Sequence, residues 1–263
     1  MICKQIMEQL EQLAPISYAE SWDNVGLLVG REEKEVKKIM IALDASDSVV
    51  EQVVKQQADM LITHHPMIFT AMKRVTDTDF IGRRILALAG ADVSYYAMHT
   101  NCDVCMMNDV AAKKIGLQTE DILETVVEDR KTGEKFGIGK VGVLKDIMSV
   151  SQLAGKVKEA FELENIRVTG DINVKVDRVA ISTGSGKSMV KAAIKKGAKV
   201  LITGDMDHHT AKDALDQGLQ IIDAGHYGTE HFMVEEIYHY LAEHFGKQVE
   251  IIMAKEEEPF LVL

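Results

Sequence analysis

The feature that most constrains the fold of this chain is a repeated pattern of strand, helix and strand. The stretch IALDASDSVVEQVVKQQADMLIT (residues 41–63) aligns with VAISTGSGKSMVKAAIKKGAKVLIT (residues 179–203) when a two-residue insertion is allowed. In both stretches an apolar run precedes a segment with apolar residues at helical spacing, and a second apolar run ending in LIT follows. Parallel strands joined by helices produce this order, so the pattern predicts an α/β architecture and favours an internal duplication.

The residues around the first repeat continue the alternation of helices and strands. Apolar residues at helical spacing predict helices over residues 2–13 and 80–90. Continuous apolar runs predict strands within residues 37–46 and 91–99. We therefore expect an α/β fold made of two related halves with mostly parallel sheets.

Motifs divide the expected fold into three parts. The first α/β half is expected over residues 1–125 and contains the segments HHP and HTNCD. A small strand–helix–strand segment at residues 126–178 is expected to lead into the second half. The second half is expected over residues 179–263 and contains GDMDHH and GHYGTE.

Histidines and acids follow four of the predicted strands. In open α/β sheets, functional groups gather beyond the carboxyl ends of the strands. His99 and Asp103 have the same four-residue spacing as His226 and Glu230, which places each pair on one face if a helix begins there. Imidazole and carboxylate groups are ligands for zinc, iron, nickel and manganese. The pattern therefore predicts a metal site at these strand ends.

The adjacent histidines His64 and His65 need a specific explanation. Neighbouring side chains on a regular strand point to opposite faces, but Pro66 is expected to end the strand, so that both rings can face one site. Two metals, each taking one histidine and bridged by Glu230 or Asp103, would account for the pair. Such a pair of ions can hold an activated water. Any one of these histidines could instead be a hydrogen-bonded structural residue.

Two further motifs leave alternatives open. In GDMDHH, Asp207 could cap a helix and leave His208 and His209 partly exposed, or these histidines could contact a metal or a substrate. Cys102 and Cys105 form a C-x-x-C motif, but no second such motif accompanies it, so packing is favoured over a zinc knuckle.

The segment TGSGKS (residues 183–188) resembles a phosphate-binding loop but lacks its first glycine, because Ile181 occupies that position. The segment is therefore expected to be a tight connection between a strand and a helix, or a turn whose backbone N–H groups bind an anion.

Composition excludes some classes of partner. The net charge of −11 argues against a broad basic face for nucleic acid. No stretch approaches the ~20 apolar residues that a membrane helix needs. The three cysteines and the absence of a signal-peptide pattern predict a reducing compartment, and we expect a cytoplasmic protein.

The segments SWDNVGLLVG, LITHHP, MHTNCD, ISTGSG, LITGDMDHH and DAGHYGTE occur in this order. With them the chain resembles, essentially from end to end, the GTP cyclohydrolase I type 2 family, also called Nif-three-like. The resemblance implies two similar α/β domains assembled as a toroidal homohexamer with metal sites facing an internal cavity. It also implies a dinuclear site of divalent ions with the ligands His64, His65, Asp103, His226 and Glu230.

The resemblance further implies roles near the metals. Glu230 and Asp103 are the expected catalytic residues, and His99 and His209 are expected near the site or in contact with substrate. The implied reaction is opening of the guanine imidazole ring of GTP with release of formate. Five protein ligands do not saturate two metals, which favours catalysis. The alternatives are a metal-dependent phosphoester hydrolase and a non-enzymatic metal-binding or regulatory protein.

Overall fold

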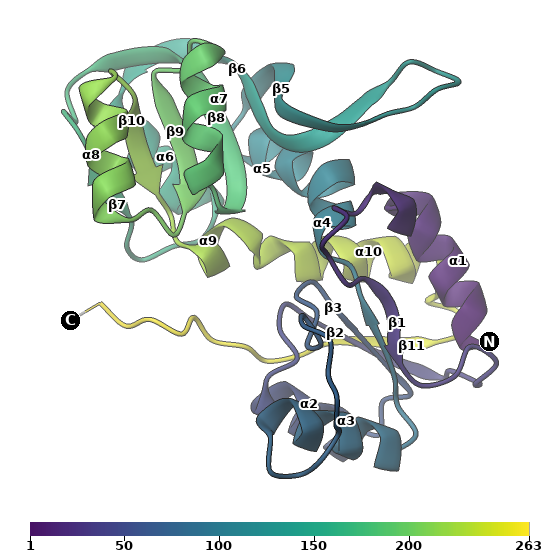
Figure 1. Cartoon of the computed structure of the whole chain (residues 1–263). Helices are drawn as coiled ribbons and strands as arrows, with labels where there is room; N and C mark the ends of the chain where they lie inside the picture. The colour runs from purple at the N-terminus through teal and green to yellow at the C-terminus, as the bar shows by residue number, and fades with distance from the viewer. Residues whose placement is uncertain (263) are drawn as a thin grey trace. The chain divides into compact units, whose positions relative to one another are not determined.

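The structure, a computed structural model, describes residues 1–262 and divides them into two compact units. The first unit consists of Met1–Cys102 and Phe232–Glu257. The second consists of Asp103–His231 and the last residues from Glu258 onward. Each unit is built around one β-sheet with helices packed on it (Figure 1). The predicted α/β fold is therefore confirmed.

The sheet of the first unit is mostly parallel, as predicted. Its strands, in sheet order, are β1 (Gly26–Val29), β4 (Ser94–Ala97), β3 (Met60–Thr63), β2 (Lys38–Ala42) and β11 (Glu250–Met253). Strands β4, β3, β2 and β11 run parallel, and only β1 pairs antiparallel, at one edge. Strands β3 and β4 are buried along their whole length, which explains their continuous apolar sequences.

Helices cover both faces of this sheet. They are α1 (Cys3–Leu13), α2 (Asp47–Lys55), α3 (Phe80–Gly90), α4 (Thr100–Cys102) and α10 (Phe232–Phe245), with a 3₁₀ turn at Ile16–Tyr18. Val49 and Val53 of α2 and Leu88 of α3 pack against Leu61 and Tyr95 of the sheet. Helix α10 packs on β2 and β11 from the other side, where α1 also lies (Figure 1).

The sheet of the second unit is mixed. Its strands, in sheet order, are β5 (Leu117–Glu128), β6 (Lys135–Ser149), β8 (Lys175–Ser185), β9 (Val200–Gly204), β10 (Gln220–Asp223) and β7 (Arg167–Thr169). Strands β8, β9 and β10 are parallel, whereas β5, β6 and β7 pair antiparallel with their neighbours. The parallel part holds the second repeat, and a long β5–β6 hairpin extends the sheet beyond it.

The helices of the second unit are short. They are α5 (Asn108–Lys114), α6 (Val150–Ala160), α7 (Val190–Lys195), α8 (His208–Asp216) and α9 (His226–Glu230), with a π-helical turn at Asp103–Met107 and a 3₁₀ turn at Lys187–Met189. Val190 and Ala193 of α7 and Ala214 of α8 pack against Leu201 and Ile221 of the sheet. Helices α7 and α8 thus cover one face of the parallel strands.

The two aligned sequence stretches fold into the same order of elements. Residues 41–63 contain the end of β2, then α2 and β3, and residues 179–203 contain most of β8, then α7 and most of β9. In each stretch the two strands are parallel neighbours. Within the described part of the chain, no helix is long and apolar enough to cross a membrane.

A buried tyrosine hydroxyl holds the turn that follows β3. The Tyr95 hydroxyl oxygen lies 2.9 Å from Thr63 Oγ1, accepts a hydrogen bond from the Met67 N–H at 2.8 Å and donates to the His65 carbonyl at 3.1 Å. Burial raises the pKa of Tyr95 to about 12, so the hydroxyl keeps its proton at neutral pH. One side chain of β4 therefore fixes the backbone on both sides of Pro66.

We expect Tyr95→Phe to lower the free energy of unfolding by about 1–3 kcal/mol, because it leaves the buried Met67 N–H without its acceptor. Tyr96→Phe is the matched control. Among the described residues, the buried Tyr96 hydroxyl has no hydrogen-bond partner, so its removal should be neutral or slightly stabilising. Urea unfolding of both variants tests this, and equal losses of stability would contradict the role assigned to the Tyr95 hydroxyl.

Candidate metal centre

Three histidines of the first unit meet at the carboxyl end of its sheet. His64 and His65 directly follow β3, and His99 follows the end of β4. Because β3 and β4 are adjacent and parallel, their last residues, Thr63 and Ala97, pair at the same edge. One ligand nitrogen from each histidine lies within 4.8 Å of the other two, which is close enough to bind one metal ion.

Both adjacent histidines face this cluster because the chain leaves strand geometry after Thr63. The ring centroids of His64 and His65 are 4.9 Å apart, and those of His64 and His99 are 5.2 Å apart. The His65 backbone N–H donates to the Leu43 carbonyl at 3.0 Å, which holds the turn against the neighbouring strand end. His64 is fully buried and His65 is partly exposed.

The Nδ1 atoms of His64 and His65 are held by oxygen acceptors. His64 Nδ1 lies 2.8 Å from the Met98 carbonyl, and His65 Nδ1 lies 2.9 Å from Asp44 Oδ1. Since carbonyl and carboxylate oxygens only accept, each Nδ1 carries the proton and the lone pair of each ring is on Nε2. A metal-binding histidine is usually held in this way.

His99 is held by Asp23. His99 Nδ1 lies 2.9 Å from Asp23 Oδ1, and Asp23 also accepts from the Thr100 N–H at 2.9 Å and from the Thr100 hydroxyl at 2.6 Å. Burial alone would raise the pKa of Asp23, but the hydrogen bonds from His99 and Thr100 outweigh it and lower the pKa to about 2. Asp23 therefore orients the His99 ring.

Glu256 is hydrogen-bonded to the backbone of Asp44, the residue that holds His65. Glu256, in the segment after β11, accepts hydrogen bonds from the backbone N–H groups of Leu43 at 2.6 Å and Asp44 at 3.0 Å. Burial, together with the nearby negative charge of Asp44, raises the pKa of Glu256 above its usual value. No motif near Glu256 indicated this contact, because the two segments are far apart in sequence.

In the second unit, His226 and Glu230 begin and end the short helix α9. His226 Nε2 lies 3.1 Å from Glu230 Oε2, so the four-residue spacing places both groups on one face. His226 Nδ1 lies 2.7 Å from Asp205 Oδ2. The same Nδ1 anchoring therefore occurs in both units. Asp205 follows β9 and has a φ of 55°, a left-handed conformation that non-glycine residues rarely adopt and that is often found at functional sites.

In the GDMDHH segment, the residue that contacts His226 is Asp205 rather than one of the paired histidines. Asp207 caps α8 by accepting a hydrogen bond from the Thr210 N–H at 3.0 Å, as one of the two interpretations of the sequence predicted. His208 and His209 are exposed on α8, where their rings contact each other. The aspartate that orients His226 was not identified from the sequence, although it lies in a recognised motif.

The TGSGKS segment provides space for Glu230. Gly184 has a φ of 62°, and a Cβ atom built on it would lie 2.2 Å from Glu230 Oε1. Its N–H donates to the Thr229 hydroxyl at 2.9 Å, which fixes β8 against α9. The glycine is therefore needed for the close approach of a buried carboxylate, a role that its local sequence does not indicate.

Asp103 begins the π-helical turn and is partly buried. Its backbone carbonyl accepts a hydrogen bond from Asn108 Nδ2 at 3.0 Å. Two residues later, burial raises the pKa of the Cys105 thiol to about 11, helped by the charge of Asp109. A protonated thiol is a poor metal ligand, which agrees with the packing interpretation of the C-x-x-C motif.

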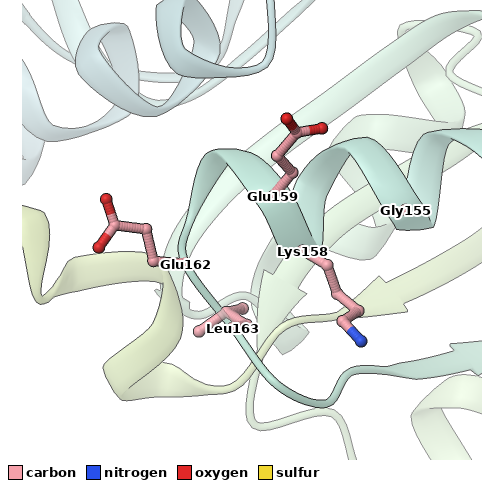
Figure 2. A pocket seen from close by; sticks show the side chains of 5 residues that line it. All are labelled: Gly155, Lys158, Glu159, Glu162 and Leu163. Carbon is pink, nitrogen blue, oxygen red and sulfur yellow. The ribbon is translucent and has the colours of Figure 1, made fainter.

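One pocket of the second unit contains none of the predicted ligands. It lies at the end of α6 and is lined by Gly155, Lys158, Glu159, Glu162 and Leu163 (Figure 2). The carboxylates of Glu159 and Glu162 point away from each other in this view, so the pocket presents no convergent acidic site. The imidazole and carboxylate groups described above, by contrast, are the donors that divalent transition metals prefer.

Comparisons with known proteins point to one family. The profile of the family described as Duf34/NIF3 (NGG1p interacting factor 3) matches residues 1–259. A Clostridium perfringens protein named "GTP cyclohydrolase 1 type 2 homolog" is 33% identical over 99% of both chains. A Clostridium acetobutylicum protein of the same name is 34% identical over 86% of this chain and 84% of its own. The crystal structure of a Bacillus cereus protein related to NIF3 superposes with a TM-score of 0.92 at 25% identity, covering 100% of this chain and 99% of that chain.

Gly184→Ala should displace the Glu230 carboxylate and weaken divalent metal binding by about 10- to 100-fold, the usual effect of disturbing the support of a ligand. Gly218→Ala is the matched control. Gly218 also has a positive φ, of 85°, but no described atom lies within 4 Å of the added Cβ. Titration of both apoproteins with Zn²⁺ measures the difference, and equal affinities would show that Glu230 does not need this space.

Protonation of Asp23 should weaken the folded state only at low pH. Because its folded pKa of about 2 lies below the usual value of 3.8, the stability it contributes is present above pH 4 and is lost as the pH falls toward 2. We therefore expect Asp23→Asn to be less stable than wild type at pH 6, with a gap that shrinks below pH 4. Urea unfolding between pH 2.5 and 6 would reject this if the gap were constant.

Proposed function

Because the chain belongs to the Duf34/NIF3 family, we propose that it is a dinuclear metal-dependent hydrolase-like protein. The candidate reaction is opening of the guanine imidazole ring of GTP with release of formate. The curated relatives' name, "GTP cyclohydrolase 1 type 2 homolog", supports this choice of reaction. The observation that carries the proposal is the anchoring of His64, His65 and His99 through Nδ1, which leaves the lone pair of each ring on Nε2.

We propose two divalent ions per chain, either zinc, iron, manganese or nickel. The proposed ligands are those that the sequence predicts, namely His64, His65, Asp103, His226 and Glu230. His99 is proposed to lie beside the metals, because one of its ring nitrogens groups with those of His64 and His65. A bound divalent ion lowers the pKa of a coordinated water and polarises a substrate oxygen.

The chain's own residues would bind and orient these groups and move protons. Asp44 and Asp23 keep His65 and His99 in the Nδ1–H form, which prevents the rings from rotating away. Glu230 and Asp103 are the proposed catalytic residues. A carboxylate there would accept a proton from the attacking water and return it to the ring nitrogen that leaves C8, which opens the ring and leaves a formamide. A second water would then hydrolyse the remaining C8–N bond and release formate. Glu230 is only 3% exposed, so it would act out of bulk water.

Two further expectations remain part of the proposal. His209, which is exposed on α8, is proposed to contact substrate on the basis of the family resemblance. Assembly as a toroidal homohexamer is proposed from the family resemblance and is testable by the mass of the particle in solution.

His65→Ala should lower the metal content of the purified protein, because it removes an imidazole ligand at a partly exposed strand end. His244→Ala is the matched control, since His244 is an exposed residue of α10 whose Nδ1 bonds to the Tyr240 carbonyl at 2.8 Å. Metal analysis of both variants after loading with Zn²⁺ or Mn²⁺ measures the effect. Full metal content in His65→Ala would remove this residue from the ligand set.

The reaction itself is tested by formate release from GTP. Metal-loaded wild type should release formate, and Asp103→Asn should lose most of this activity because the amide cannot accept the proton. Equal rates in both proteins would reject the catalytic role of Asp103. Metal binding without formate release under any of the four metals would reject GTP ring opening and leave the metal-dependent phosphoester hydrolase and the non-enzymatic metal-binding protein as the alternatives.

A further inference from the structure

Two large aromatic side chains are exposed beside the histidines of the first unit. Trp22, the single tryptophan of the chain, is 57% exposed, and Phe69 is 54% exposed. Their ring centroids are 5.8 Å apart with an interplanar angle of 54°. Tryptophan and phenylalanine gain much of their stabilisation from burial, so a contacting pair left open to solvent indicates a surface that binds something.

The pair is continuous with the histidine cluster. The Trp22 ring approaches the His99 ring edge-on at 6.0 Å, and the Phe69 ring approaches it edge-on at 6.3 Å. His99 is in turn 5.2 Å from His64 and 5.7 Å from His65 between ring centroids. A flat ligand lying on Trp22 or Phe69 would therefore have one edge directed toward the histidines.

Hydrogen bonds fix the two loops that carry these rings. Asn24 Nδ2 donates to the Ile68 carbonyl at 2.5 Å and so ties the loop of Trp22 to the loop of Phe69. Asp23, next to Trp22, accepts from His99, which anchors the same loop to the cluster. The aromatic pair is therefore organised before any ligand binds, which reduces the entropy cost of binding.

We propose that Trp22 and Phe69 form the binding surface for a planar heteroaromatic ring of the substrate, with the reacting edge of the ring toward His99. This inference rests on the proposed function and adds two specificity residues to it. Base rings stack on exposed aromatic side chains in many proteins. The tilt of 54° fits a ring that stacks on one side chain and meets the edge of the other.

A small ligand fits this surface better than a protein partner. The chain neighbours Ser21 and Thr70 are exposed polar residues. A stable protein interface buries roughly 800 Å² on each side, far more than two aromatic side chains supply. If a second copy of the chain covered Trp22 and Phe69 in solution, the proposal would be overturned.

Because Trp22 is the only tryptophan, its fluorescence reports directly on this surface. Metal-loaded protein is titrated with guanosine, and separately with ribose 5-phosphate and inorganic triphosphate, which lack the ring. We expect guanosine to quench Trp22, and Phe69→Leu to weaken guanosine binding by about tenfold. Phe80→Leu is the matched control, since Phe80 is similarly exposed at 51% on α3 and should leave binding unchanged.

Three results would overturn the proposal. These are equal quenching by the ligands without a ring, equal guanosine affinity in Phe69→Leu and wild type, and a Trp22 that acrylamide cannot reach in the unliganded protein. Trp22→Leu provides a second test by calorimetry, with a loss of guanosine binding expected. Guanosine binding without formate release from GTP would reject the proposed reaction only. Formate release with an unchanged KM in Phe69→Leu would reject the ring-binding surface only.

Discussion

The parallel pairing of β3 with β4 is the constraint on which the histidine cluster depends. Because Thr63 and Ala97 pair in register, the residues that follow the two strands leave the sheet at the same edge. His64 and His99 are 35 residues apart in sequence and are brought together only by this pairing. The Tyr95 hydroxyl then holds the turn after β3, so that His65 joins them rather than pointing to the opposite face.

A second layer of groups determines the chemistry of these histidines. A backbone carbonyl or a carboxylate lies against Nδ1 in each of the four anchored rings, which sets the Nδ1–H tautomer of His64, His65 and His99. The acids involved are Asp23, Asp44 and Asp205, and none of them is in the predicted ligand set. In a chain with a net charge of −11, some acidic residues thus have a specific orienting task rather than a solubilising one.

Close packing determines where the Glu230 carboxylate can lie. The buried carboxylate fits beside β8 only because Gly184 has no side chain, and the N–H of the same glycine holds Thr229. A segment that resembles an incomplete phosphate-binding loop is therefore explained by the space a carboxylate needs. The exposed pair Trp22 and Phe69 is the opposite case, since it leaves apolar surface open beside His99 where a ring could stack.

The sequence by itself determined the α/β class, most strands and helices of the first unit and the strand-end positions of His64, His99 and His226, because hydrophobic periodicity and terminal motifs are local signals. Only the tertiary structure decided that α10 and β11 join the first unit and that β5, β6 and β7 make the second sheet mixed. It also decided that Glu256 supports Asp44 and that Gly184 makes room for Glu230. These contacts join residues far apart in the chain, and their local sequences carry no periodic or motif signal that specifies the partner.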